Sequence, residues 1–261
     1  MISCLILVAG IGSRLKHITK NTPKSLVKLI NKPILEYQLN TLRKCGIENI
    51  ALVTGYESQK FNRYNLKSFH NKFYYETNMV ESIFVARPFL SGLQGDLIIS
   101  YGDIVYQKNN LDKLIKTKGD ISIMIDEDWI KLWSLRNANP LNDAETLKYD
   151  AKGNIAELGK KPKDLTEING QYTGLIKINH KKINDFIKFY DDMNHDAQYN
   201  NKPFKMLYLT DFLQYLINNN WEITPSKVNN GWLEIDTVED LFLYEKLFYE
   251  KKLNDLWDDQ K

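Results

Sequence analysis

The N-terminal segment, residues 1–33, constrains the fold of this chain more than any other stretch. An apolar run at residues 5–9, LILVA, leads directly into the loop GIGSRL at residues 10–15. This order predicts a buried strand that ends in a glycine turn. Glycine has no Cβ, so backbone N–H groups in such a turn can closely approach phosphate oxygens. With Arg14 in the loop and Lys24 soon after it, the segment predicts a site for a triphosphate.

Two common phosphate-binding loops do not fit this segment. The dinucleotide fingerprint needs a small residue where this chain has Leu15, and the Gly-Lys-Ser/Thr of the P-loop does not occur in the chain. The glycines alone are equally typical of an ordinary turn from strand to helix. The pairs Pro23-Lys24 and Lys32-Pro33 nearby favour the phosphate-binding interpretation.

Strand-like and helical patterns alternate along the first half. Strands are expected at residues 4–8, 49–54, 72–75, 96–100 and 120–125, and helices at 33–45, 80–90 and 110–116. Such alternation predicts an α/β fold of Rossmann-like type, a mixed and mostly parallel sheet flanked by helices. Ligands of such sheets bind at the carboxyl ends of the strands, where Gly10, Gly55 and Asp103 follow three of them.

The second half reads differently. We expect a hairpin from 146–149 and 155–158, a strand at 172–178, and helices at 181–192 and 204–218. A second hairpin is expected from 222–228 and 232–235, around the turn Asn229-Asn230-Gly231. The last element expected is a helix at 237–256, capped by Asp236 or Thr237. Since no linker is visible, residues 1–261 are expected to form one domain. Its nucleotide-binding half would be residues 1–125 and its acceptor-binding half residues 126–261.

Composition narrows the class of protein. A chain of 261 residues with 43% hydrophobic content can bury one substantial core, and a net charge of +2 gives no reason to expect nucleic-acid binding. Neither a signal peptide nor an apolar run long enough to cross a membrane is visible, so a soluble cytoplasmic protein without membrane contact is expected. The apolar side of the final helix would pack on the sheet or form a homodimer face.

Three carboxylates form a candidate metal site. Glu234 and Asp236 are two residues apart on an expected strand, which places both on one face, and two such acids repel unless a cation lies between them. Asp103 follows a buried strand, where it could also serve only as a turn former. Mg²⁺ is the expected ion because it prefers oxygen ligands and accompanies phosphates.

These motifs together resemble the signature of nucleotidyltransferases (pyrophosphorylases). The matching stretches are G-x-G-S-R-L at 10–15, T-x-x-x-P-K at 19–24, and K-P-I-L at 32–35, while W-L-E-I-D at 232–236 resembles the cytidylyltransferase branch. The resemblance implies CTP as donor and Mg²⁺ on Asp103, Glu234 and Asp236. It also implies a nucleotide site made of Leu7, Ala9, Gly10, Gly12, Ser13, Arg14, Lys24, Gly55, Tyr56, Asn78, Ser82, Tyr101, Gly102 and Asp103.

The same resemblance points to the acceptor. The chain resembles cytidylyltransferases of capsule phosphoramidate synthesis, which act on L-glutamine phosphate. It resembles more loosely the cytidylyltransferases that act on phosphocholine or 2-aminoethylphosphonate. The resemblance has further implications for the site. It implies catalytic roles for Arg14, Lys24 and Lys160, and an acceptor site made of Asp128, Trp129, Trp133, Arg136, Lys160 and Lys161. Trp129 and Trp133, four apart on a helix, are as typical of core packing as of a wall for an ammonium.

Two alternatives remain open at this point. The first is a related enzyme that uses UTP or dTTP and a sugar 1-phosphate, although such enzymes usually have D-G-D where this chain has Tyr101-Gly102-Asp103. The second is a nucleotide-binding module without activity that regulates a partner.

Overall fold

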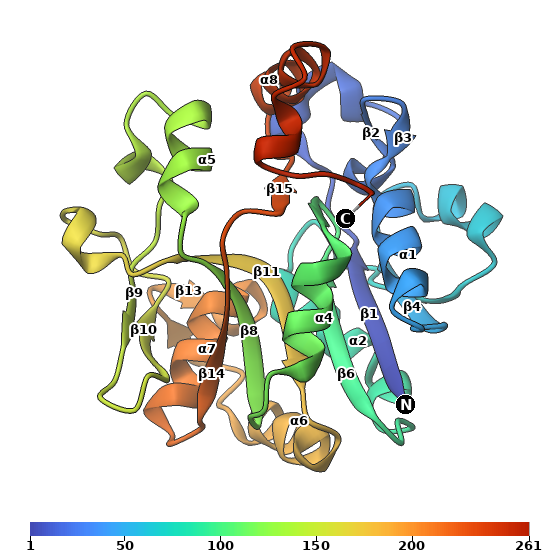
Figure 1. Ribbon diagram of the computed structural model, residues 1–261. Coiled ribbons are helices and arrows are strands. Elements are labelled where there is room, and N and C mark those ends of the chain that lie inside the picture. The colour runs from blue at the N-terminus through green and yellow to red at the C-terminus, as the bar shows by residue number, and fades with distance from the viewer. Residues whose placement is uncertain (261) are drawn as a thin grey trace.

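A central sheet organises the chain, and the computed structural model describes residues 1–260. The sheet has seven strands in the order β14-β8-β11-β6-β1-β4-β5 (Figure 1). Their bounds are β1 Ile2–Val8, β4 Asn49–Thr54, β5 Lys67–His70, β6 Asp96–Tyr101, β8 Ile121–Asp126, β11 Gln171–Ile178 and β14 Ile223–Val228. Only β11 runs antiparallel to its neighbours in this sheet. The expected mixed, mostly parallel sheet is therefore confirmed.

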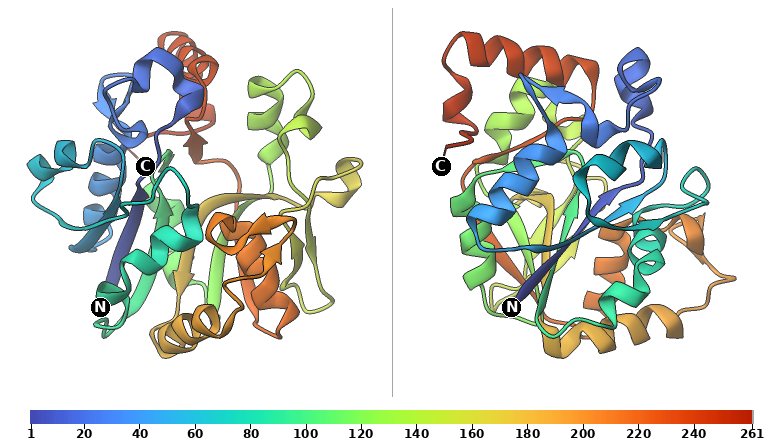
Figure 2. Two further views of the ribbon diagram at one scale, coloured as in Figure 1. Left: turned by 180° about the vertical axis from the view of Figure 1, so that it is seen from behind. Right: turned by 90° about the vertical axis from the view of Figure 1, so that its right-hand side faces the viewer.

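Helices cover both faces of this sheet. One apolar cluster includes side chains of α1 (Ile34–Lys44), α4 (Lys108–Lys116), α5 (Trp129–Arg136) and α8 (Val238–Tyr249). The other includes α2 (Met79–Val85), α3 (Arg87–Leu90), α6 (Ile183–Asp192) and α7 (Leu209–Asn218), which lie together in the view from behind (Figure 2). Alternate residues of β1 enter the two clusters, which explains why its sequence is continuously apolar.

Short elements complete the fold. Four two-stranded ribbons pair β2 (Lys28–Leu29) with β3 (Lys32–Pro33), β7 (Ile104–Tyr106) with β15 (Trp232–Glu234), β9 (Leu147–Tyr149) with β10 (Ile155–Leu158), and β12 (Gln198–Tyr199) with β13 (Lys202–Pro203). The expected hairpin at 146–158 is confirmed as β9 and β10. The 3₁₀ segments are η1 Ser13–Thr19, η2 Lys24–Leu26, η3 Ser58–Tyr64, η4 Pro140–Asn142, η5 Leu165–Glu167, η6 His180–Lys182, η7 Phe204–Met206 and η8 Leu253–Asp255.

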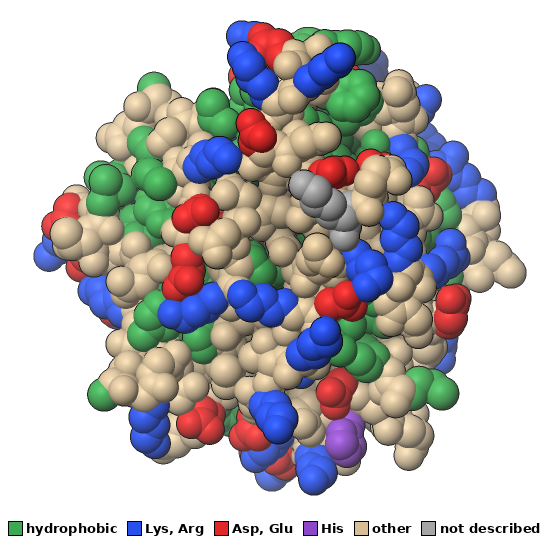
Figure 3. Space-filling view, in the orientation of Figure 1, with side chains coloured by type: hydrophobic (Ala, Val, Ile, Leu, Met, Phe, Trp, Pro, Cys, Tyr) green, Lys and Arg blue, Asp and Glu red, His purple; other side chains and the backbone are tan. Residues whose placement is uncertain are grey.

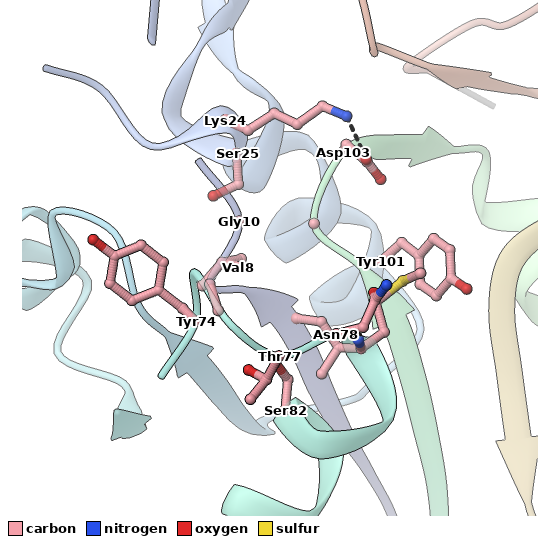
Figure 4. A pocket seen from close by; sticks show the side chains of 14 residues that line it. Val8, Gly10, Lys24, Ser25, Tyr74, Thr77, Asn78, Ser82, Tyr101 and Asp103 are labelled. Carbon is pink, nitrogen blue, oxygen red and sulfur yellow. Dashed lines mark hydrogen bonds and ion pairs between the residues drawn. The ribbon is translucent and has the colours of Figure 1, made fainter. Parts of the chain in front are cut away.

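The strand expected at residues 72–75 is wrong. The edge strand is β5, which ends at His70, and the aromatic residues after it form a turn. Asn71 stops the strand because its Oδ1 accepts a hydrogen bond from the backbone N–H of Phe73 at 3.0 Å. The chain turns there and brings Tyr74 over the end of β1 (Figure 4).

The second expected hairpin, from 222–228 and 232–235, is also wrong. β14 pairs in parallel with β8 at the edge of the main sheet, whereas β15 pairs with β7 in a separate ribbon. The connecting turn does use left-handed conformations, at Asn230 and Gly231. The buried carboxylate of Asp126 holds this turn, accepting from the Asn230 backbone N–H and from the Trp232 indole, both at 2.9 Å.

Three expected helices are interrupted or shorter than their sequence patterns. Residues 80–90 form α2 and α3 with a break at Ala86, and the final helix, α8, ends at Tyr249 before a left-handed residue, Lys251. The helix expected at 204–218 begins only at Leu209, as α7, because the backbone is extended at Leu207 and Tyr208 after the 3₁₀ segment η7. Thr237 is the cap of α8, in a reciprocal capping box with Asp240.

Acidic and basic side chains are interspersed over the face shown in Figure 3, as the small net charge requires. None of the helices formed by residues 1–260 combines the length and apolar character needed to cross a bilayer.

Candidate active site

The carboxyl ends of β1 and β6 open into a cavity of about 150 Å³, called the first cavity (Figure 4). Its other walls come from η2, the turn after β5 and the start of α2. It is lined by Leu7, Val8, Ala9, Gly10, Lys24, Ser25, Tyr74, Thr77, Asn78, Met79, Ser82, Tyr101, Gly102 and Asp103. Most of the residues expected to bind nucleotide therefore lie together.

Lys24 joins carboxylates from two distant parts of the chain. Its Nζ lies 2.6 Å from Asp103 Oδ2 and 2.7 Å from Asp236 Oδ1. Burial alone would lower the pKa of Lys24, but the charges of Asp103, Asp236 and Glu234 outweigh burial and raise it. Lys24 therefore stays charged and holds the two acids at one point.

Gly12 of the glycine loop supports Lys24 rather than lining the first cavity. Its φ is 71°, and a Cβ at this position would lie 2.8 Å from the Cβ of Lys24. Its carbonyl accepts a hydrogen bond from Thr19 Oγ1 at 2.9 Å, which fixes the turn. Glycine is required here because the lysine side chain crosses directly over it. Ser13, by contrast, is exposed and lines none of the cavities described here.

Gly55 and Tyr56 do not line the first cavity but contact residues that do. The Tyr56 backbone N–H donates to the Ala9 carbonyl at 3.1 Å, and its hydroxyl donates to the Lys20 carbonyl at 2.5 Å. A Cβ on Gly55 would lie 2.6 Å from the Cβ of Tyr74. Both residues were expected to bind nucleotide, but they hold the walls of the cavity instead of forming them.

A second cavity, of about 240 Å³, adjoins the first and shares Met79 and Tyr101 with it. Arg14 lines this second cavity and forms an ion pair with Asp236. The lining is Arg14, Met79, Tyr101, Trp133, Asp143, Glu145, Gln171, Tyr172, Thr173, Gly174, Tyr208, Thr210, Trp232, Glu234 and Asp236. Asp103 faces the first cavity and Asp236 the second, so Lys24 lies at their junction.

Arg136, which was expected to bind the acceptor, forms ion pairs with two acidic residues of the protein instead. Only 4% of its side chain is exposed, and it contacts Glu234 at 2.8 Å and Asp240 at 2.9 Å. It therefore links the end of α5 to β15 and to the first turn of α8. Glu234, although it lines the second cavity, has one carboxylate oxygen bound to Arg136.

The two tryptophans of α5 have separate positions. Their rings meet edge to face with centroids 6.0 Å apart, and both side chains are buried. Trp133 lines the second cavity, whereas Trp129 lines none of those described and packs in the core. Asp128 precedes the helix, where its backbone N–H donates to Asp126 at 3.0 Å. The core-packing alternative therefore describes Trp129.

Lys160 and Lys161 line a third cavity, which shares Glu145, Tyr208 and Thr210 with the second. Lys160 is paired with Glu157 on the β9–β10 hairpin, and Lys161 donates to the Asn142 carbonyl at 2.7 Å. Both lysines therefore belong to the third cavity, whereas Lys24 lies at the junction of the first and second.

The structure brings together two of the three acids that were expected to bind a metal ion. No cluster of three or more His, Cys, Asp or Glu residues placed to hold a metal ion occurs within residues 1–260. Asp103 and Asp236 are the pair brought together, and Oδ1 of Asp103 is buried without a hydrogen-bond partner in this part of the chain. A buried anionic oxygen left free in this way fits a hard cation such as Mg²⁺.

Sequence reasoning missed several lining residues. Ser25 directly follows Lys24, so its place could have been inferred. Tyr74 was missed because it falls in the segment 72–75, which was wrongly predicted to be a strand. Sequence reasoning assigned no role to Glu145 or Gln171, which meet at the second cavity through the hydrogen bonds between Gln171, at the start of β11, and the backbone of Glu145.

The first part of the chain matches a known family. Residues 4–150 match the model of the MobA-like NTP transferase domain. Together with the parallel sheet and the cavity at its carboxyl edge, this match shows that the chain belongs to the family and is a nucleotidyltransferase.

Individual relatives narrow the comparison. The chain is 42% identical over 247 residues to the CTP:phosphoglutamine cytidylyltransferase of Campylobacter jejuni, covering 92% of this chain and 97% of that one. It is 36% identical over 111 residues to the choline-phosphate cytidylyltransferase of Haemophilus influenzae, covering 41% of this chain and 46% of the relative. Its fold is similar to that of the inositol-1-phosphate CTP transferase from T. maritima, with a TM-score of 0.70, 18% identity and coverage of 98% and 97%.

Proposed function

We propose that this protein is a Mg²⁺-dependent cytidylyltransferase. It transfers CMP from CTP to the phosphate of a small phosphorylated amine or amino acid, with L-glutamine phosphate as the acceptor, and releases pyrophosphate. The proposal includes a cytoplasmic role in capsule synthesis. It is supported by the 42% identity to a CTP:phosphoglutamine cytidylyltransferase over nearly the whole of both chains.

The observation that carries the proposal is the junction at Lys24. One cavity lies at the carboxyl ends of the parallel strands, where such folds bind nucleotides, and the other opens beside it. Asp103 from the first cavity and Asp236 from the second meet on one ammonium. A bond between a nucleotide and an acceptor would form at such a point.

The chemistry needs positioning and charge neutralisation. An oxygen of the acceptor phosphate attacks the α-phosphorus of CTP, the bond from that phosphorus to the bridging oxygen breaks, and the electron pair leaves with pyrophosphate. Because the second pKa of a phosphate monoester is about 6, the acceptor is already largely dianionic at neutral pH and needs no general base. Arg14 and Lys24 supply positive charge on the two sides of Asp236.

Asp103 and Asp236 would hold Mg²⁺, together with phosphate oxygens of the substrate. Glu234 is the third proposed ligand and would exchange its contact with Arg136 for the ion. The ion would neutralise charge that develops on the phosphates. Asp236→Ala should abolish Mg²⁺-dependent turnover in a protein that remains folded, and near-normal activity would reject this role.

A substrate panel tests the function. Pyrophosphate release is measured with Mg²⁺ and CTP, UTP or dTTP, against L-glutamine phosphate, phosphocholine, 2-aminoethylphosphonate and glucose 1-phosphate. Turnover with CTP and L-glutamine phosphate is expected to exceed that of every other pair. A preference for UTP or dTTP with the sugar phosphate would contradict the proposal, as would no release with any pair.

A further inference from the structure

The second cavity contains a carboxylate that no residue of the site neutralises. Glu145 lies between η4 and β9, and its carboxylate has neither an ion pair nor a hydrogen bond within residues 1–260. Three lysines line the third cavity together with Glu145, but each has another partner: Lys160 pairs with Glu157, Lys161 donates to the Asn142 carbonyl, and the Nζ of Lys202 lies 3.5 Å from the centre of the Tyr208 ring. The Glu145 carboxylate therefore has no ion-pair partner of its own among the described residues and is available to a ligand cation.

The backbone of Glu145 is held firmly. The Gln171 side-chain carbonyl accepts from the Glu145 N–H at 3.1 Å, and its amide group donates to the Glu145 carbonyl at 2.6 Å. Gln171 is itself buried at the start of β11. This double contact fixes the backbone from which the Glu145 side chain projects, at the wall of the cavity, before any ligand arrives.

The surroundings of Glu145 are negative. Its pKa is raised to about 7, first by burial and then by the charges of Asp211, Glu234 and Asp143. Asp211 is 9% exposed, and its Oδ2 has no hydrogen-bond partner in the described chain. A ligand cation would relieve this repulsion.

Aromatic side chains surround the same space. Trp133, Tyr101, Tyr172, Tyr208 and Trp232 all line the second cavity. Trp133 is 4% exposed, and its indole N–H has no partner within residues 1–260. Aromatic faces beside a carboxylate are typical of sites for organic ammonium groups.

Two ends of the second cavity can be distinguished by the cavities that they adjoin. Arg14 is linked through Asp236 to Lys24 at the junction with the first cavity, where the phosphates are proposed to bind, whereas Glu145 also lines the third cavity. A ligand that satisfies both ends carries a phosphate on one side and an ammonium on the other. A sugar 1-phosphate would leave Glu145 unpaired.

We propose that Glu145 is the residue that recognises the ammonium group of the acceptor and thereby selects amines and amino acids over phosphate esters that carry no ammonium group. This inference rests on the proposed function, since it places the acceptor in the second cavity. Glu145 takes no part in bond making, so its loss should act through acceptor binding rather than on the nucleotide.

The test compares two acceptors that differ only at this group, L-glutamine phosphate and its analogue with hydrogen in place of the α-ammonium. Their affinities for the wild type and for Glu145→Gln are measured by calorimetry, and kcat and KM are measured with CTP. Glu127→Gln is the matched control, because Glu127 pairs with Lys227 at 2.8 Å and lines none of the three cavities. Thermal unfolding confirms that each variant is folded.

Glu145→Gln is expected to weaken binding of L-glutamine phosphate about 10- to 100-fold, mainly as a rise in KM. The KM for CTP and the binding of the deamino analogue should stay within about twofold, and Glu127→Gln should match the wild type. Equal binding of L-glutamine phosphate by the wild type and Glu145→Gln would overturn the inference. If the predicted binding difference is found but the wild type shows no turnover with CTP, the proposed function fails and the inference on Glu145 stands.

Discussion

At the residue scale, Lys24 holds the acidic residues of the site together, which an exposed lysine could not do. Its ammonium replaces what would otherwise be direct repulsion between Asp103 and Asp236, and its side chain lies directly over Gly12. The glycine loop and the lysine that follows it thus act as one unit. Their spacing in the sequence reflects this contact, because a larger residue at position 12 would displace the lysine.

Replacing Lys24 with Met should keep most of its volume and remove its charge. We expect initial rates of pyrophosphate release at saturating CTP to fall on the order of 10²- to 10³-fold, since an oxygen-stabilising cation contributes about 3 kcal/mol to such a barrier. Lys28→Met, at an exposed position on β2, is the control and should retain activity. Turnover of Lys24→Met close to that of Lys28→Met would refute the role.

Glu145 should make stability depend on pH. Burial, Asp211, Glu234 and Asp143 raise its pKa from 4.5 to about 7, while Lys202 lowers it. The folded protein therefore binds this proton more tightly than the unfolded chain. The resulting stabilisation is complete below pH 4.5 and is lost as the pH rises through 7.

Urea unfolding at pH 5 and pH 8 measures this effect. Between the two, the free energy of unfolding of the wild type should fall by about 1–3 kcal/mol relative to Glu145→Gln, a value reduced for partial exposure. Parallel pH dependence in the two proteins would show that Glu145 titrates normally.

At the scale of elements, Arg136 ties three segments together. It lies at the end of α5, and its guanidinium binds Glu234 of β15 and Asp240 in the capping box of α8. These contacts lower the pKa of Asp240 against the opposing effect of burial. Because Asp236 lies between Glu234 and Asp240 in the chain, Arg136 also fixes the approach of Asp236 to the site.

Arg136→Met should destabilise the fold by about 3–5 kcal/mol, because it leaves two largely buried carboxylates unpaired. Arg87→Met is the matched control, since Arg87 forms a surface ion pair with Asp191 and should cost less than about 1 kcal/mol. Thermal or urea unfolding of both variants gives the comparison. Equal losses would mean that the buried network contributes no more than the surface pair.

The elements also show where sequence reasoning succeeds. Continuous apolar runs and glycine turns predicted β1, β4, β6 and β8 closely, because both faces of these strands meet helices. The turn at Asn229-Asn230-Gly231 has hairpin chemistry, yet its conformation is held by Asp126, a residue far away in the sequence. A local pattern cannot reveal a partner that only the folded sheet brings near.

The site follows the same rule. The glycine loop, Lys24 and Asp103 could be predicted because a motif marks each of them. The role proposed for Glu145 could not be predicted, because it depends on a carboxylate left without an ion-pair partner in the described part of the chain, which is a property of the folded cavity. Arg136 and Trp129 are residue types that often bind ligands, but both side chains are buried here. Arg136 forms ion pairs with Glu234 and Asp240, and Trp129 packs in the apolar core.

At the scale of the whole molecule, one sheet contributes walls to both the first and the second cavity. Strands from the first half of the chain, β1 and β6, end at the first cavity, while β11 and the segment containing β15 from the second half contribute walls of the second. The helices α5 and α8 lie at this end of the sheet, above the ends of the parallel strands (Figure 1). The two cavities therefore adjoin where the first half of the chain contacts the second.

The central claim is that the α-phosphorus of CTP moves to the acceptor, and isotopic labelling tests it directly. The wild-type protein is incubated with Mg²⁺, L-glutamine phosphate and CTP labelled either at the α- or at the γ-phosphate. We expect the α-label in a CMP–acceptor product and the γ-label in an equal amount of pyrophosphate. Transfer of the γ-label to the acceptor, or release of the α-label as free CMP without an acceptor product, would contradict the account.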